Sequence, residues 1–308
     1  MSLHQASGRW RLGLTLALAT AGFWATLPVA LKITLEQIDA ITLTWFRFVV
    51  AFVLLGGWLA ARGKLKPLAS LRRRHWLLLL LAGVMLIGNY VFYLLGVQYT
   101  SPANAQLLIQ LAPLLMALGG IVVFRERFNA WQWAGLAVIV IGLSLFFADQ
   151  LRADTLPAGR YVFGSLIVVL AAVVWAVYAL MQKQLLLRLS SWLILLVIYA
   201  LASVLLFPFA QPAALLRLDP LHGALLLYCA LNTLGAYGCF AEALAHWEAS
   251  RVSTILAVTP LLSIAAVSAV HAGWPTLIRP EHVSWLGFAG AATVLVGSAL
   301  AALMGQRR

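Results

Sequence analysis

Long apolar runs, separated by short polar or proline-containing breaks, dominate the pattern of this chain. Ten runs can be drawn from apolar length and from the breakers between them, at about 12–31, 41–61, 76–98, 102–124, 131–148, 162–182, 192–209, 223–244, 252–271 and 284–303. Most of them approach the roughly 20 residues that an α-helix needs to cross a bilayer. The pattern therefore predicts an all-α integral membrane protein with ten transmembrane helices.

Composition strengthens this prediction. The chain is 63% apolar and only 10% charged, whereas soluble domains are about 45–50% apolar. No Asp, Glu, Lys or Arg stands between Arg74 and Arg125, so this stretch has to cross the membrane twice. We expect it to turn at Tyr99 to Pro102, because proline lacks a backbone donor and disfavours a helical residue before it.

The run that follows this turn contains a second proline, Pro113, near its middle. A proline there removes one backbone hydrogen bond and leaves a carbonyl free. Membrane helices tolerate such a break where it is buried in protein or lines a cavity. Gln106, Gln110 and Pro113 are spaced i, i+4 and i+7, so a continuous helix places them on one face. We predict that this face looks into a polar cavity.

The distribution of charge along the chain predicts its orientation. The net charge of +12 would suggest a nucleic-acid partner for a soluble protein, but here it reflects topology, and we expect no nucleic acid to bind. Six basic residues, Arg47 among them, are assigned to the outer side together with six acidic residues. By the positive-inside rule both termini are predicted to be cytoplasmic. The other 15 of the 21 basic residues are then cytoplasmic: Arg9, Arg11, Arg62, Lys64, Lys66, Arg72, Arg73, Arg74, Arg125, Arg127, Lys183, Arg188, Arg251, Arg307 and Arg308.

The chain divides into two similar halves, which we place at residues 1–155 and 156–308. Trp24 with Lys32 matches Trp175 with Lys183 at an offset of 151, and an offset of 147 carries the stretch 88–93 onto 235–240 and Pro113 onto Pro260. Each half holds five predicted spans, an odd number, so the second half is inverted relative to the first. Inverted five-helix repeats around a central cavity are an architecture of transporters.

The same residues carry a resemblance to a known family. They are Trp24 with Lys32, residues 47–51, the stretch from Tyr99 through Pro113, the segment 133–142, Trp175 with Lys183, and the stretch leading to Pro260. With them the chain resembles the EamA family of the drug/metabolite transporter superfamily, and within it looks like the YddG type of aromatic amino-acid exporter. The resemblance implies ten helices, cytoplasmic termini, a bacterial inner membrane and a central cavity.

Polar and aromatic residues inside the predicted spans are the candidates for a substrate site. Aromatic walls suit a flat apolar side chain or a cation, and amides suit the head of an amino acid. For each residue the alternative is helix packing or, near a span end, anchoring at the interface. Pro113 and Pro260 are the candidate hinges. The candidate binding residues are Trp24, Asn89, Tyr90, Tyr93, Gln106, Gln110, Trp175, Tyr178, Asn232 and Tyr237.

These features predict a secondary transporter that exports small amphipathic metabolites, in particular aromatic or neutral amino acids, by alternating access. The alternatives are efflux of cationic drugs by proton antiport, for which Glu242 is the most embedded acid, and a selective channel. An enzyme is disfavoured because the sequence has no Asp/Glu/His cluster and no glycine-rich phosphate loop. We expect no cofactor and no metal. The expected partners are a small-molecule substrate and the lipid bilayer, with the protein working as a monomer.

Overall fold

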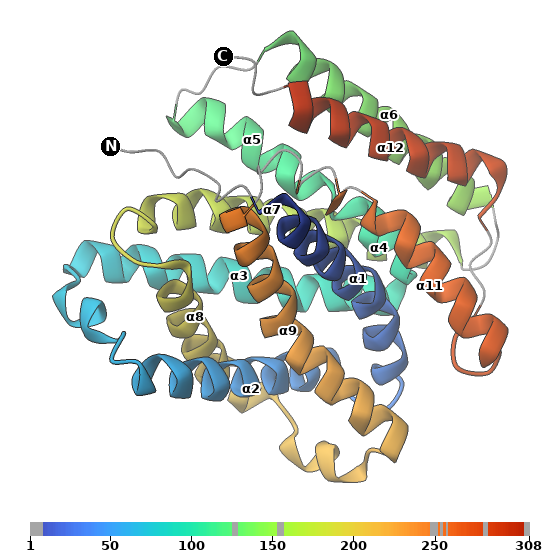
Figure 1. The fold of residues 1–308 in the computed structure, drawn as a ribbon. Coiled ribbons are helices and arrows are strands. Elements are labelled where there is room, and N and C mark those ends of the chain that lie inside the picture. Colours follow the sequence, from blue (N-terminus) through green and yellow to red (C-terminus); the bar gives the residue numbers. More distant parts are fainter. Residues whose placement is uncertain are drawn as a thin grey trace.

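The computed structural model describes residues 9–124, 129–152, 157–246, 252, 255–256, 258–279 and 283–304. Their regular structure is entirely helical (Figure 1), so the all-α prediction is confirmed for these ranges.

Seven of the described helices are long and apolar enough to cross a membrane, judged by length and composition. The elements are α1 (Trp10–Thr34), α2 (Ala40–Ala61), α3 (Arg73–Tyr99), α4 (Pro102–Leu108), α5 (Leu111–Phe124), α6 (Ala130–Arg152), α7 (Ala158–Leu185), α8 (Ser191–Leu206), α9 (Pro220–His246), α11 (Thr259–Gly273) and α12 (Trp285–Met304). Short 3₁₀ turns, η1 (Lys66–Ser70), η2 (Phe207–Phe209) and η3 (Pro212–Arg217), lie in the connections.

Polar residues at the predicted breaks start several helices by satisfying free backbone N–H groups. Asp39 caps α2 by accepting from the N–H groups of residues 41 and 42, and Ser101 and Ser190 cap α4 and α8 in the same way. Asp219 accepts from the backbone N–H and the ring of His222 in the first turn of α9, and these hydrogen bonds lower the pKa of the Asp219 carboxyl to about 2. The breakers in the sequence thus act as helix start signals.

The fourth predicted span differs from the expectation of one helix over 102–124. It is interrupted after Leu108, and α5 begins at Leu111. The ring of Pro113 has no N–H to offer the carbonyl of Ile109, and this carbonyl accepts instead from the Ala112 N–H at 2.9 Å. The break therefore precedes the proline, and the expected free carbonyl is satisfied by a tighter turn.

The ninth predicted span shows the same relation between a proline and a helix start. Pro260 is in the first turn of α11, which begins at Thr259. Part of the expected segment 252–258 lies outside the described residues. Both prolines that the repeat aligns are therefore in the first turn of a helix.

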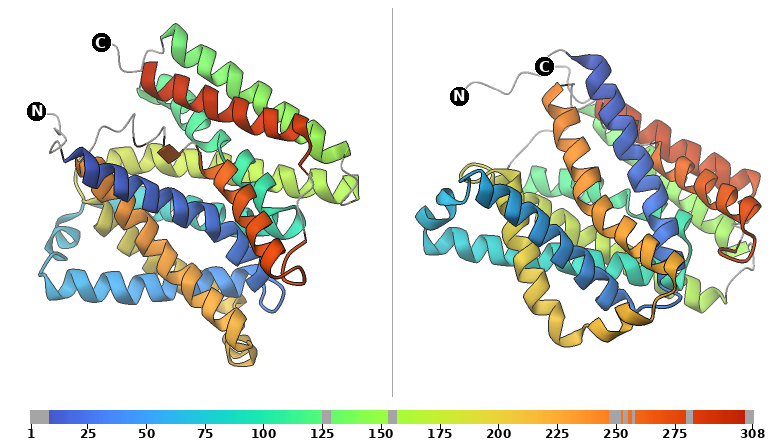
Figure 2. Two further views of the ribbon diagram at one scale, coloured as in Figure 1. Left: turned by 45° about the vertical axis from the view of Figure 1, so that its right-hand side comes forward. Right: turned by 60° about the horizontal axis from the view of Figure 1, so that its bottom comes forward.

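Helix packing repeats between the two halves of the chain. The pair α3 and α7 corresponds to α9 and α1, and the pair α5 and α7 corresponds to α11 and α1. In the same way, α3 packs on α8 and its equivalent α9 packs on α2. The equivalent helices α2 and α8 pack on each other, and so do α6 and α12. Figures 1 and 2 show α1 beside α9 and α6 beside α12 in every view. Exchanging each helix with its equivalent in the other half therefore reproduces these contacts.

Glycines let α6 and α12 approach backbone to backbone. A Cβ atom built on Gly135 would lie 2.8 Å from the Gly297 carbonyl oxygen, and one built on Gly142 would lie 2.7 Å from the Gly290 carbonyl oxygen. Residue numbers rise along α6 as they fall along α12, so the two helices are antiparallel. Small residues favour such close packing in membranes, where burial of apolar surface gives helices little reason to associate.

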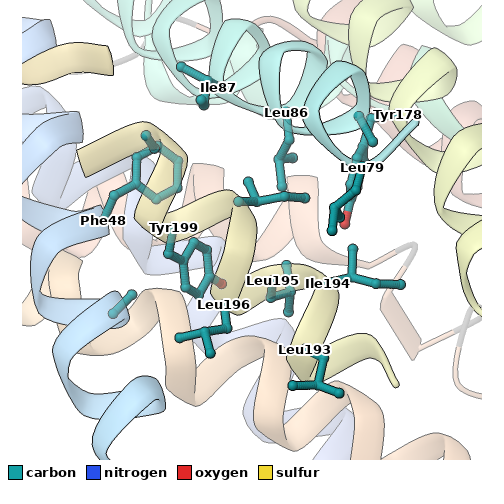
Figure 3. Packing of buried hydrophobic residues seen from close by; sticks show 14 of the residues in the cluster. Phe48, Leu79, Leu86, Ile87, Tyr178, Leu193, Ile194, Leu195, Leu196 and Tyr199 are labelled. Carbon is teal, nitrogen blue, oxygen red and sulfur yellow. The ribbon is translucent and has the colours of Figure 1, made fainter. Parts of the chain in front are cut away.

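The largest cluster of buried apolar side chains joins α2, α3, α7 and α8. Phe48 of α2 and Tyr199 of α8 are fully buried in it, with ring centroids 5.6 Å apart (Figure 3). Many large apolar side chains point outward instead, among them Trp285, which is 90% exposed. An apolar surface around an apolar core fits a protein whose solvent is lipid.

We predict that Gly142→Ala destabilises the protein by about 1–3 kcal/mol, because the added methyl group forces the α6 and α12 backbones apart. The measurement is the melting temperature of the purified protein in detergent. Gly57→Ala is the matched control, since Gly57 lies in α2 with nothing within 4 Å of its added Cβ. Equal melting temperatures for the two variants would contradict the role of the close contact.

Candidate functional site

A group of buried and half-buried aromatic residues connects helices from both halves of the chain. Trp24 of α1 lies edge-on to Tyr237 of α9 with ring centroids 6.0 Å apart, and it also contacts Phe240 at 5.7 Å. Tyr90 of α3 packs on Phe48 at 4.7 Å, and Tyr90 and Tyr237 are near neighbours. The predicted residues Trp24, Tyr90 and Tyr237 therefore form one connected set.

Two further predicted aromatic residues extend this set along α7. The rings of Trp175 and Tyr178 are in edge-on contact at 6.5 Å, and Tyr178 is buried in the same apolar cluster as Tyr90. Trp175 packs against the border of that cluster. The aromatic group thus draws on α1, α3, α7 and α9.

The amides of the candidate set have several different roles. Asn89 of α3 donates to the Ala171 carbonyl of α7 at 2.9 Å, and Asn232 of α9 donates to the Phe23 carbonyl of α1, also at 2.9 Å. These two bonds join equivalent helix pairs, α3 with α7 and α9 with α1. The roles considered for Asn89 and Asn232 were substrate binding and helix packing. In this structure both side chains join neighbouring helices.

Tyr93 and Gln106 form a separate pair beside the aromatic group. The Tyr93 hydroxyl donates to Gln106 Oε1 at 2.8 Å, which ties α3 to the short helix α4. Gln110 lies between α4 and α5 and is half-buried, so the expected shared helical face of Gln106, Gln110 and Pro113 is interrupted. Within the described part of the chain, no hydrogen bond or ring contact links the Gln110 side chain to the other candidates.

Arg47 belongs to this region, although it is not among the candidate binding residues. It was counted with the charges of the outer side, and the structure shows it buried within α2 with 2% of its surface exposed. Its guanidinium lies 4.9 Å from the centre of the Tyr90 ring, and its Nε donates to Thr233 Oγ1 of α9 at 3.1 Å. The signal was available, because a charged residue inside an apolar run marks a functional position by default.

Lys32 supports the turn that separates α3 from α4. Its ammonium group donates to the carbonyl oxygens of Val97, Gln98 and Thr100 at 2.7, 2.9 and 2.9 Å. These carbonyls end α3, where a cation is favoured both by the unpaired acceptors and by the helix dipole. Lys32, which appears above only as a marker of the repeat and of the family resemblance, therefore holds the end of α3 against α1.

A model of the EamA-like transporter family matches residues 11–148 and again residues 162–303. The chain belongs to this family. The family lies within the drug/metabolite transporter superfamily, and the double match indicates duplicated halves. The chain is therefore a multi-pass membrane transporter and not an enzyme, and both of these predictions are confirmed.

The curated relatives are also transporters, and their names differ in whether they give a substrate. The chain is 36% identical to the uncharacterized inner membrane transporter YhbE of Escherichia coli over 95% of its own length and 91% of that protein. It is 34% identical to an uncharacterized transporter of Haemophilus influenzae, covering 95% of both chains. A probable amino-acid metabolite efflux pump of Escherichia coli is 25% identical, covering 92% of each chain. These relatives do not point specifically to the YddG type, so that finer assignment stays a prediction.

A solved crystal structure shares the fold, with a TM-score of 0.62 and 21% sequence identity over 98% of this chain and 99% of the other. Among the described residues no group of three metal-binding side chains gathers.

We predict that Lys32→Met lowers the melting temperature, since three carbonyls at the end of α3 lose a charged donor. Hydrogen bonds to charged groups are worth about 1.5–3 kcal/mol. Lys64→Met is the matched control, because Lys64 is exposed and its ammonium lies over the Trp58 ring at 5.2 Å. A Lys32→Met protein as stable as the Lys64→Met protein would show that the three bonds add nothing.

Proposed function

We propose that the protein is a secondary transporter that exports small amphipathic metabolites, in particular aromatic or neutral amino acids, by alternating access. The observation that carries this proposal is the aromatic group of Trp24, Tyr90, Trp175, Tyr178 and Tyr237, which takes members from both halves of the chain. Aromatic rings bind flat apolar side chains well. A site shared by two halves can open to either side as the halves move.

The proposed architecture is ten transmembrane helices in two inverted repeats, residues 1–155 and 156–308, around a central cavity. The antiparallel packing of α6 on α12, the last helix of each half, supports the inversion. We place both termini in the cytoplasm and the protein in a bacterial inner membrane, in line with the name of the YhbE relative. We expect it to work as a monomer without a cofactor.

Amino acids are the favoured substrate class for two reasons. The 25% identical relative from Escherichia coli is described as a probable amino-acid metabolite efflux pump. Tyr93 of α3, one helical turn from Tyr90, also forms a polar pair with Gln106, which offers hydrogen-bonding groups to the head of such a molecule.

Efflux of cationic drugs by proton antiport has less support. Antiport of this kind needs an embedded carboxylate that exchanges a proton for a cation. Glu242, the candidate, is 63% exposed near the end of α9, with its carboxylate 3.6 Å from the His246 ring. Buried Asp149 is already occupied at the start of α12, where it accepts from the hydroxyl and the backbone N–H of Ser284.

We predict that the purified protein in liposomes carries labelled phenylalanine or tryptophan without requiring a pH gradient, and that a quaternary ammonium dye is carried poorly. Saturable flux that is stimulated by substrate on the opposite side would separate a transporter from a channel. Flux of the dye alone, driven by the gradient, would instead establish proton-coupled drug efflux and refute the proposal.

Paired tryptophan variants locate the site in the same assay. Trp24→Ala should raise the KM for the aromatic substrate, because the ring that packs on Tyr237 is removed. Trp285→Ala is the control, since Trp285 is 90% exposed at the start of α12. Equal transport by both variants would exclude Trp24 from the site.

We further propose that Pro113 and Pro260 mark the hinges of the transport cycle. Both lie in the first turn of a helix, Pro113 lies next to the interruption between α4 and α5, and helices bend most readily where the hydrogen-bond ladder is broken. Spin labels across each mouth of the protein should show distances that change with substrate, measured by double electron–electron resonance. Pro113→Ala should reduce this change, whereas distances indifferent to substrate and to the variant would refute the hinge.

A further inference from the structure

Arg47 is a charged side chain buried at a depth where charge is costly. It is the eighth residue of α2, which places it roughly 10 Å along the helix from its first residue at 1.5 Å per residue. Charged residues inside transmembrane segments are rare, and those that persist pair with a partner or bind a substrate or ion. The question is what balances the guanidinium of Arg47.

The neighbours of Arg47 supply contact without negative charge. The Tyr90 ring provides a cation–π contact, and Thr233 Oγ1 accepts one hydrogen bond from Nε while the Thr233 hydroxyl donates to the Cys229 carbonyl. The ion pairs found within the described ranges are His222 with Asp219 and His246 with Glu242, and neither involves Arg47. No described carboxylate therefore neutralises this cation.

A buried donor without an acceptor lies on α8, the helix that packs on α2. The buried hydroxyl group of Tyr199 has no hydrogen-bond partner among the described residues. Its ring contacts Phe48, the residue that follows Arg47 in α2. Buried polar atoms are almost always paired, so an unpaired one calls for an explanation. A cation and a free O–H donor are together what an anion requires.

We propose that Arg47 binds the carboxylate of the transported substrate. The planar guanidinium matches the two oxygen atoms of a carboxylate, and such pairs gain strength away from water. The aromatic group around Tyr90 then takes the apolar side chain of the same molecule. This inference rests on the proposed function, and it defines the substrate class as amphipathic molecules that carry a carboxylate.

The proposal separates substrates by charge as well as by shape. A molecule that carries a carboxylate neutralises Arg47, whereas an amide, an amine or a quaternary cation of the same size leaves the guanidinium unbalanced or repels it. Phenylalanine should therefore be carried well and phenylalaninamide poorly. 3-Phenylpropionate, which keeps the carboxylate and lacks the amine, should compete with phenylalanine.

The test is uptake of labelled phenylalanine into liposomes, with phenylalaninamide and 3-phenylpropionate as competitors. Wild-type protein should be inhibited by 3-phenylpropionate and far less by the amide. Arg47→Gln should raise the KM for phenylalanine about ten- to a hundredfold, the effect of losing a hydrogen bond to a charged group, and should abolish the preference for acid over amide. Arg47→Lys should restore part of the preference, because it restores the charge.

Arg62→Gln is the matched control. Arg62 also stacks its guanidinium on an aromatic ring, Trp58, at 5.5 Å, but it is exposed at the end of α2. This variant should transport as the wild type does. Gel filtration and melting temperature report whether each variant is folded, so a loss of fold is separated from a loss of binding.

The outcomes distinguish this inference from the function on which it rests. If wild-type protein carries no amino acid, the proposed function fails. If wild-type protein carries phenylalanine but takes the amide equally well, or if folded Arg47→Gln keeps both the KM and the preference of the wild type, Arg47 does not bind the carboxylate. The wild-type comparison remains decisive even when Arg47→Gln does not fold.

Discussion

The structure depends on the need of every polar group in a bilayer to find its hydrogen-bond partner inside the protein, since lipid offers none. Threonine hydroxyls satisfy it within their own helices, as Thr34 does by donating to the Ala30 carbonyl. Lys32 satisfies it for the end of α3, and Asn89 and Asn232 satisfy it by bonding to carbonyls of neighbouring helices. Helix ends, breaks and crossings are therefore held by specific polar side chains, while apolar residues fill the space between them.

Because of the same constraint, a buried polar or charged group without a matching partner in the protein is informative about function. In a soluble protein an arginine without a carboxylate partner is ordinary, because water solvates it. Within a membrane helix, the described neighbours of the Arg47 guanidinium include the Tyr90 ring and the Thr233 hydroxyl group, and neither carries a negative charge. The aromatic residues that gather beside it extend the argument, since they give the apolar part of a ligand a place next to the charge. Helix packing explains each aromatic contact singly, but it leaves the cation unexplained.

Sequence patterns predicted the helices well and their interruptions less well. Apolar length and proline are local properties, so the long helices and the start of α4 at Pro102 followed from them directly. The break before Pro113 was misplaced because the position of a kink depends on which turn can satisfy the released carbonyl, and here Ala112 supplies the N–H. Arg47 falls inside the predicted span 41–61, but it was counted only as a charge of the outer side, because no local pattern shows that Tyr90 and Thr233 of other helices surround it. The connected set of Trp24, Tyr90 and Tyr237 depends on how α1, α3 and α9 pack, and no local pattern encodes that packing.

The duplication bears on why a single charge stands in this region. Asp39 and Ser190 cap α2 and α8, so the offset of 151 that relates Trp24 to Trp175 also relates Arg47 to Ile198 and Phe48 to Tyr199. The rings of Phe48 and Tyr199 are in contact with each other, which places them where equivalent positions of the two halves meet. A residue next to such a point stays near the middle of the molecule when the halves exchange conformations. Two arginines there would repel each other, whereas Arg47 with an isoleucine at the equivalent position supplies a single positive charge for one anion.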